Sequence, residues 1–197
     1  MRLYHVPNSS SQRVLWLLEE TGEPYDLTVL GDRASRLQDP EHMARHPMGR
    51  VPVVENDGEF IFESAAICLH IADGYPNAGL IPPPGTRERG LVYQWSLFAI
   101  TEIQAKMIQS RMSREFNSQG SETAKESLLQ AAAVLEKALE GHDYLVGNRF
   151  TVADVLVSAT LSGVRRLDVA ELPPGLNAYL DAMDVRPAKQ RAEVLNT

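Results

Sequence analysis

The chain has 197 residues, of which 44% are apolar and 23% are charged, a composition typical of one or two globular domains with a hydrophobic core. It excludes an intrinsically disordered chain, and no apolar run approaches the ~18 residues that a membrane span needs. The formal net charge of -7 argues against a nucleic-acid partner, which would require a basic face. One cysteine, Cys68, excludes an internal disulfide, and the N-terminus lacks an apolar signal core, so we expect a cytoplasmic protein.

The first third of the chain predicts alternating strands and helices. A short apolar strand at residues 2–6 is followed by Ser9-Ser10-Ser11, whose hydroxyls are candidate N-caps for an amphipathic helix that ends at Gly22. β-branched residues predict a second strand at 25–30. The polar stretch at 32–46 predicts an irregular helix.

Two more strands and a helix complete this domain. The apolar runs at 51–54 and 60–62 flank Asn56-Asp57-Gly58, and an Asp-Gly pair between such runs predicts a hairpin because glycine accepts a positive φ. Ser64 is the candidate N-cap of a helix that continues to Asp73. The order predicts a layered α/β domain over residues 1–75.

The rest of the chain predicts helices only. Residues 76–86 are rich in proline and glycine and are interpreted as a linker. Helical periodicity then predicts a long helix from 87 to about 116 and a second from 122 to about 140. A third opens at Thr151, where Asp154 completes an aspartate version of the capping box, and two short helices follow. The fold class is therefore α/β + all-α, with an all-helical domain over residues 87–197.

A hydroxyl-rich turn, Ser9-Ser10-Ser11, is the first feature with candidate chemistry. It precedes a helix, whose first amides carry a positive partial charge and stabilise an anion such as a thiolate. The same serines serve equally well as helix caps only, so the residues alone leave both interpretations open. The five histidines lack metal-ligand spacing, and each is interpreted as a surface or core residue, so no metal site is predicted.

The second feature consists of two residue pairs that begin predicted elements. If the Val51–Pro52 bond is cis, the neighbouring backbone is presented for strand-like pairing with a peptide; otherwise the proline marks a strand edge. Ser64 at a helix N-terminus binds a carboxylate, and Glu63 binds an ammonium. Together they would recognise an α-amino-acid end group. The basic stretch before this strand, which ends at Arg50, either guides an anion or is a solvated face.

These segments together resemble the cytosolic glutathione S-transferase superfamily, in particular its bacterial serine-type branch. The resemblance follows the whole chain in order and rests on four segments: Leu3-Tyr4 with Pro7, Ser9, Ser11 and Arg13-Val14; His46 to Val54; Phe62 to Ile67; and Phe150 to Asp154. It implies a thioredoxin-like N-terminal domain that binds glutathione, followed by an all-helical C-terminal domain that forms the second-substrate pocket. It also implies a homodimer.

The resemblance assigns roles to individual residues. Ser9 matches the hydroxyl that donates to the glutathione sulfur, although three consecutive serines leave Ser10 and Ser11 as alternatives. The remaining glutathione-binding positions are Val51 before Pro52 for the cysteinyl backbone, Arg50 near the glycyl end, and Glu63 with Ser64 for the γ-glutamyl group. For the second-substrate pocket, helical spacing on the long helix suggests Phe98 and Glu102.

The predicted activity is that of a glutathione S-transferase. A serine-stabilised thiolate of bound glutathione, the co-substrate, would attack an electrophilic or disulfide small-molecule second substrate without a metal. Two alternatives remain open: a maleylacetoacetate-type isomerase, whose similar turn usually carries a cysteine, and a non-catalytic interaction module. We expect no nucleic-acid and no membrane partner.

Overall fold

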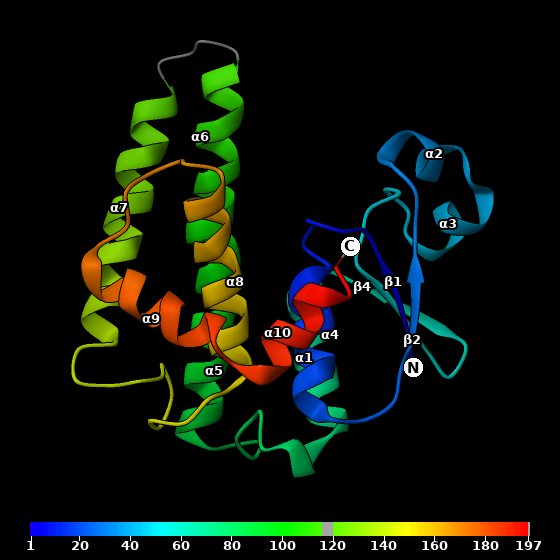
Figure 1. Cartoon of the computed structure of the whole chain (residues 1–197), viewed down its shortest axis with the longest axis horizontal. Helices are drawn as coiled ribbons and strands as arrows, with labels where there is room; N and C mark the ends of the chain where they lie inside the picture. The colour runs from blue at the N-terminus through cyan, green and yellow to red at the C-terminus, as the bar shows by residue number, and fades with distance from the viewer. Residues whose placement is uncertain (116–119, 197) are drawn as a thin grey trace. The chain divides into compact units, whose positions relative to one another are not determined.

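A computed structural model describes residues 1–115 and 120–196 of the chain (Figure 1). They form two compact units, Met1–Ile81 together with the segment from Arg186, and Pro82–Val185. The first contains a four-stranded mixed sheet and the second is helical, which confirms the predicted fold class. The C-terminal segment differs from the prediction for 87–197, because it packs with the α/β unit.

The sheet of the first unit has the strand order β2-β1-β3-β4. Its strands are β1 (Arg2–His5), β2 (Asp26–Val29), β3 (Val53–Asn56) and β4 (Glu59–Phe62). β1 runs parallel to β2 and antiparallel to β3, which pairs antiparallel with β4. Asp57 and Gly58 both have positive φ in the β3–β4 turn, as the Asp-Gly signal predicts.

Helices α1 (Gln12–Thr21) and α4 (Ser64–Gly74) pack on each other and on the sheet. Gly22 ends α1 in the left-handed conformation, as predicted. The stretch predicted as one irregular helix is two, α2 (Arg33–Gln38) and α3 (Pro40–Arg45), each capped by the preceding aspartate. The short 3₁₀ helix η1 (Pro76–Ala78) follows α4.

The last helix, α10 (Pro187–Val194), is held against α1 by charged pairs. Arg186 donates two hydrogen bonds of 2.8 Å to the carboxylate of Glu20, and Arg191 donates one of 2.7 Å to Glu19. The Lys189 ammonium lies 5.1 Å from the centre of the Trp16 ring. These contacts explain why the C-terminal segment belongs to the first unit.

In the second unit, the predicted long helix is divided by a π-helical segment. It comprises α5 (Arg87–Phe98), the π-helix η2 (Ala99–Gln104) and α6 (Ala105–Glu115); the predicted end at Phe116 lies outside the described residues. The other helices are α7 (Gly120–Ala138), α8 (Val152–Arg166) and α9 (Pro174–Asp184). Most residues of α8 are buried, so this helix forms the centre of the helical core.

The predicted capping box at the start of α8 is confirmed. Asp154 is fully buried and accepts hydrogen bonds from the Thr151 amide (2.8 Å), the Leu145 amide (3.0 Å) and the Tyr179 hydroxyl (3.0 Å). Burial raises the pKa of Asp154, although these donors favour its charged form. The Asp154 carboxylate therefore connects α9 with the loop that precedes α8.

Replacing Asp154 with alanine is expected to lower the free energy of unfolding by about 3 kcal/mol or more, because several buried donors lose their acceptor together. Urea denaturation followed by circular dichroism measures the loss. The exposed Asp143, whose carboxylate makes no such contacts with the described residues, provides the control: Asp143→Ala is expected within ~0.5 kcal/mol of the parent. Equal stability of the two variants would contradict the structural role of Asp154.

Candidate functional site

The pairing of the strands brings three loop segments to one end of the sheet. Tyr4 is paired with Val53, and Val53 with Phe62, so the end of β1, the start of β3 and the end of β4 are neighbours. The serine turn follows β1, the Val51–Pro52 bond, which is cis, precedes β3, and Glu63-Ser64 follows β4. The residues predicted to bind glutathione are therefore gathered in one unit.

Ser11 is fully buried and its hydroxyl is turned into the protein. Its Oγ lies 2.8 Å from Nδ1 of His5 and accepts the Val6 amide at 3.1 Å. Ser11 occupies the N-cap position of α1 but makes no side-chain capping bond, so the predicted cap is wrong. Its hydroxyl is also inaccessible to a ligand.

Ser9 and Ser10 are half-buried, and their hydroxyls have different partners. Ser9 Oγ lies 2.7 Å from the Val6 carbonyl and 2.7 Å from Ser11 Oγ. Ser10 donates to the Val51 carbonyl at 3.0 Å, which connects the serine turn to the segment before β3. Two of the three candidate serines are thus only partly buried, near the start of α1.

Glu63, not Ser64, occupies the N-cap position of α4, so the predicted cap at Ser64 is also wrong. Glu63 is exposed and has φ 73° and ψ 111°, a conformation that non-glycine residues rarely adopt. Such backbone strain costs ~1–3 kcal/mol and clusters at functional sites. Ser64 is buried in the first turn of α4, next to the strained residue.

A buried arginine lies beneath this turn. Arg13 on α1 is only 7% exposed, and its guanidinium donates to Ser64 Oγ at 3.5 Å. Within the described residues it has no carboxylate partner, and burial lowers its pKa. Together with the helix dipole of α4, this unpaired cation makes the helix N-terminus favourable for an anion.

The basic stretch before β3, which contains Arg36, His42, Arg45, His46 and Arg50, carries less charge than its composition suggests. His42 and His46 are buried, and desolvation lowers the pKa of both, so they are neutral at pH 7. Arg45 is paired with Glu41 at 2.8 Å. Arg50, in contrast, is exposed and has no side-chain partner among the described residues.

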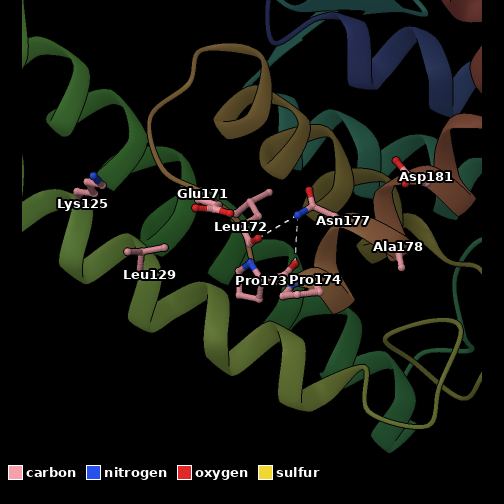
Figure 2. Close-up of a pocket in the computed structure, with 9 residues that line it drawn as sticks. All are labelled: Lys125, Leu129, Glu171, Leu172, Pro173, Pro174, Asn177, Ala178 and Asp181. Carbon is pink, nitrogen blue, oxygen red and sulfur yellow. Dashed lines mark hydrogen bonds between the residues drawn. The ribbon is translucent and has the colours of Figure 1, made fainter.

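Phe98 and Glu102, predicted to line the second-substrate pocket, lie in the second unit and are half-buried. Phe98 contacts Trp95 edge-on, with ring centres 5.7 Å apart. A groove of about 890 Å³ in the same unit is formed elsewhere, between α7 and the start of α9 (Figure 2), with neither residue in its lining. The assignment of Phe98 and Glu102 stays a prediction.

Two site residues, His5 and Arg13, lack a predicted role. Strand alternation places His5 on the same face as Leu3, which is a signal for burial but not for a hydrogen-bond partner.

Within the described residues, no group of three or more His, Cys, Asp or Glu is placed to hold a metal ion. The described helices include none that is long and apolar enough to cross a membrane.

Comparison with known proteins identifies the family. The model of the glutathione S-transferase N-terminal domain matches residues 1–73, and that of the C-terminal domain matches residues 98–187. The chain belongs to the cytosolic glutathione S-transferase superfamily.

Its relatives include enzymes and a translation factor. Glutathione S-transferase GstA of Escherichia coli O157:H7 is 25% identical over 98% of this chain and 96% of its own length. The structure of a sphingomonad glutathione S-transferase complexed with glutathione is 29% identical, with a TM-score of 0.83 over 100% of this chain and 98% of that one. Elongation factor 1-gamma-B of Xenopus laevis is 32% identical over 62% of this chain but only 28% of its own length.

Cys68 is expected to be inert in the folded protein. It is fully buried on α4, and burial raises the pKa of its thiol to about 12, so almost no thiolate forms at neutral pH. A thiol-specific disulfide reagent should therefore find no reactive thiol in the native protein and one per chain in denaturant. Rapid reaction of the native protein would contradict this assignment.

Proposed function

We propose that this protein is a glutathione transferase that activates the glutathione thiol through the hydroxyl of Ser9. The observation that carries the proposal is the gathering, at one end of the sheet, of an accessible serine turn, the Val51 main chain and the Glu63-Ser64 pair. A γ-glutamyl peptide with a central thiol suits this site, because the site offers a hydroxyl donor, a main-chain pairing segment and a binding place for an amino-acid end group.

The γ-glutamyl group supplies a carboxylate and an ammonium. The carboxylate would bind Ser64 and the first amides of α4, where the buried Arg13 adds positive potential. The ammonium would bind the exposed carboxylate of Glu63. The main chain of Val51 would pair with the cysteinyl residue, and Arg50 would approach the glycyl carboxylate.

With glutathione bound through these contacts, its cysteinyl thiol would lie near the serine turn. A model thiol has a pKa of ~8.5, and a hydrogen bond to a charged group is worth ~1.5–3 kcal/mol, or about one to two pKa units. The Ser9 hydroxyl and the α1 dipole would lower the thiol pKa to ~6.5–7.5, which gives a large thiolate fraction without a general base. The sulfur then forms a bond to an electrophilic carbon, whose leaving group departs with its electron pair.

Ser9→Ala is expected to raise the pKa of bound glutathione by at least one unit, because the thiolate loses its hydroxyl donor. Thiolate ultraviolet absorbance, followed against pH for wild type, Ser9→Ala and Ser10→Ala, measures the shift. Ser10 donates to Val51, so its variant is expected to keep the lowered pKa.

Each other outcome of this titration has a distinct meaning. Loss of the shift in Ser10→Ala alone would make Ser10 the donor. The isomerase needs a separate activity assay, in which turnover of a cis-diketo acid with glutathione unconsumed would favour it. Absence of glutathione binding would favour a non-catalytic interaction module.

Glu63→Gln is expected to weaken glutathione binding about 10–100-fold while leaving the thiol pKa of the bound tripeptide low, since only the ammonium contact is lost. Isothermal titration calorimetry measures the affinity. Glu59→Gln, at an exposed glutamate of β4, the strand that precedes Glu63, is the control and should bind normally. Equal affinities would remove Glu63 from the site.

We also propose that the protein is a cytoplasmic homodimer. Apolar side chains are exposed in both units, among them Phe60 (39%), Phe62 (41%) and Leu97 (58%), and contact with a second chain would cover such surface. Sedimentation velocity should show one species with twice the mass of a chain. A monomer at all concentrations would contradict the proposal.

A further inference from the structure

A chain of hydrogen bonds leads from the serine turn into the core. Ser9 Oγ lies 2.7 Å from Ser11 Oγ, which lies 2.8 Å from Nδ1 of His5. His5 is fully buried at the end of β1. Burial lowers its pKa, which the Asn196 side chain opposes only in part, so the imidazole is neutral at pH 7 and one of its nitrogens is unprotonated.

Main-chain donors restrict the two hydroxyls further. The Val6 amide donates to Ser11 Oγ at 3.1 Å, and the Ser11 amide donates to Ser9 Oγ at 3.2 Å. The carbonyl of Val6 accepts from either hydroxyl, at 2.7 Å from Ser9 and 3.1 Å from Ser11. Each hydroxyl has one hydrogen and two lone pairs, so the direction of each bond can be counted.

If Nδ1 of His5 carries the proton, it donates to Ser11. The two lone pairs of Ser11 Oγ are then filled by His5 and the Val6 amide, and its hydrogen is directed to Ser9. Ser9 Oγ accepts from that hydrogen and from the Ser11 amide. The hydrogen of the Ser9 hydroxyl is then not used by Ser11. Without a ligand it is donated to the Val6 carbonyl, and with glutathione bound it can turn to the sulfur.

If Nε2 carries the proton, the chain reverses. Ser11 must donate to Nδ1, so the 2.7 Å contact between the two serines needs the hydrogen of Ser9. Ser9 then presents only a lone pair to solvent, which repels a thiolate. The tautomer of His5 therefore decides whether the Ser9 hydroxyl donates outward.

The surroundings of Nε2 favour the first arrangement. Within the described residues Nε2 has no hydrogen-bond partner, although it is buried. A buried N–H without a partner is rarer than an acceptor without one, so the proton belongs on Nδ1. The contact of Ser9 Oγ with the Val6 carbonyl points the same way: at 2.7 Å it needs the hydrogen of Ser9, which only the first arrangement leaves free.

We propose that His5 is a positioning residue for thiol activation: its Nδ1–H aligns the hydroxyls of Ser11 and Ser9 so that Ser9 donates to the glutathione sulfur. His5 does not touch the substrate and transfers no proton. The aligned bonds polarise one another, which strengthens the last of them. This inference rests on the proposed function of Ser9.

The first test reads the tautomer directly in the intact protein. Nitrogen-15 NMR of histidine-labelled protein with glutathione bound should show a pyrrole-type Nδ1 and a pyridine-type Nε2 for His5. The His5→Asn spectrum assigns the signals by their loss. A pyridine-type Nδ1 would overturn the inference, whatever the variants show.

The second test compares two amides at the same position. The shorter side chain of His5→Asn can replace the Nδ1 donor with its amide, whereas the longer side chain of His5→Gln places its amide near Nε2. We expect His5→Asn to retain the low thiol pKa and His5→Gln to raise it by ~0.5–1 unit, the size of one neutral hydrogen bond. His142→Asn, at an exposed histidine of the second unit, should leave it unchanged.

Ser11→Ala keeps the inference testable if a His5 variant does not fold, because it breaks the chain and leaves His5 in place. It should raise the thiol pKa as much as His5→Gln does, and the double variant should raise it no further. If Ser9→Ala removes the shift but Ser11→Ala and His5→Gln do not, the inference on His5 is wrong and the proposed function stands. If wild-type protein lowers no thiol pKa, the proposed function itself fails.

Discussion

The candidate site depends on the antiparallel pairing of β3 with both β1 and β4. This pairing places the turn after β1, the residues before β3 and the residues after β4 at one end of the sheet, although the serine turn is about forty residues or more from the other two segments in the chain. A register shift of one residue would reverse which side chains face α1 and α4. Leu3 and its partner Val54 are fully buried side by side on one face of the sheet, and a shifted register would separate them.

Electrostatics explains how an acidic protein can attract an anionic ligand. The net charge of -7 is distributed over the whole chain, whereas the N-terminus of α4 has Arg13 beneath it, which meets no carboxylate in the described part of the chain. A buried charge is screened less by salt than an exposed one, so Arg13 acts on its surroundings more strongly than its single charge suggests. The histidines of the basic stretch contribute nothing comparable, since His42 and His46 are neutral.

The sequence predicted features that depend on local chemistry. The Asp57-Gly58 turn, the end of α1 at Gly22 and the capping box of Thr151 and Asp154 are confirmed, because a few adjacent residues determine each of them. Features that depend on distant partners were not predictable in this way. Glu20 meets Arg186 across 166 positions, and no local pattern indicates that α10 packs on α1.

The serine turn shows why a site is harder to predict than a fold. Three identical side chains follow one another, so the sequence gives them equal standing, and their roles differ only through the atoms around them. Ser11 faces the buried His5, Ser10 reaches the Val51 carbonyl, and Ser9 Oγ accepts the Ser11 amide. In the proposed arrangement, Ser9 can direct its own hydrogen to a ligand because His5 and the Val6 amide fill both lone pairs of Ser11. A buried neighbour that cannot touch a substrate would thus determine which serine donates.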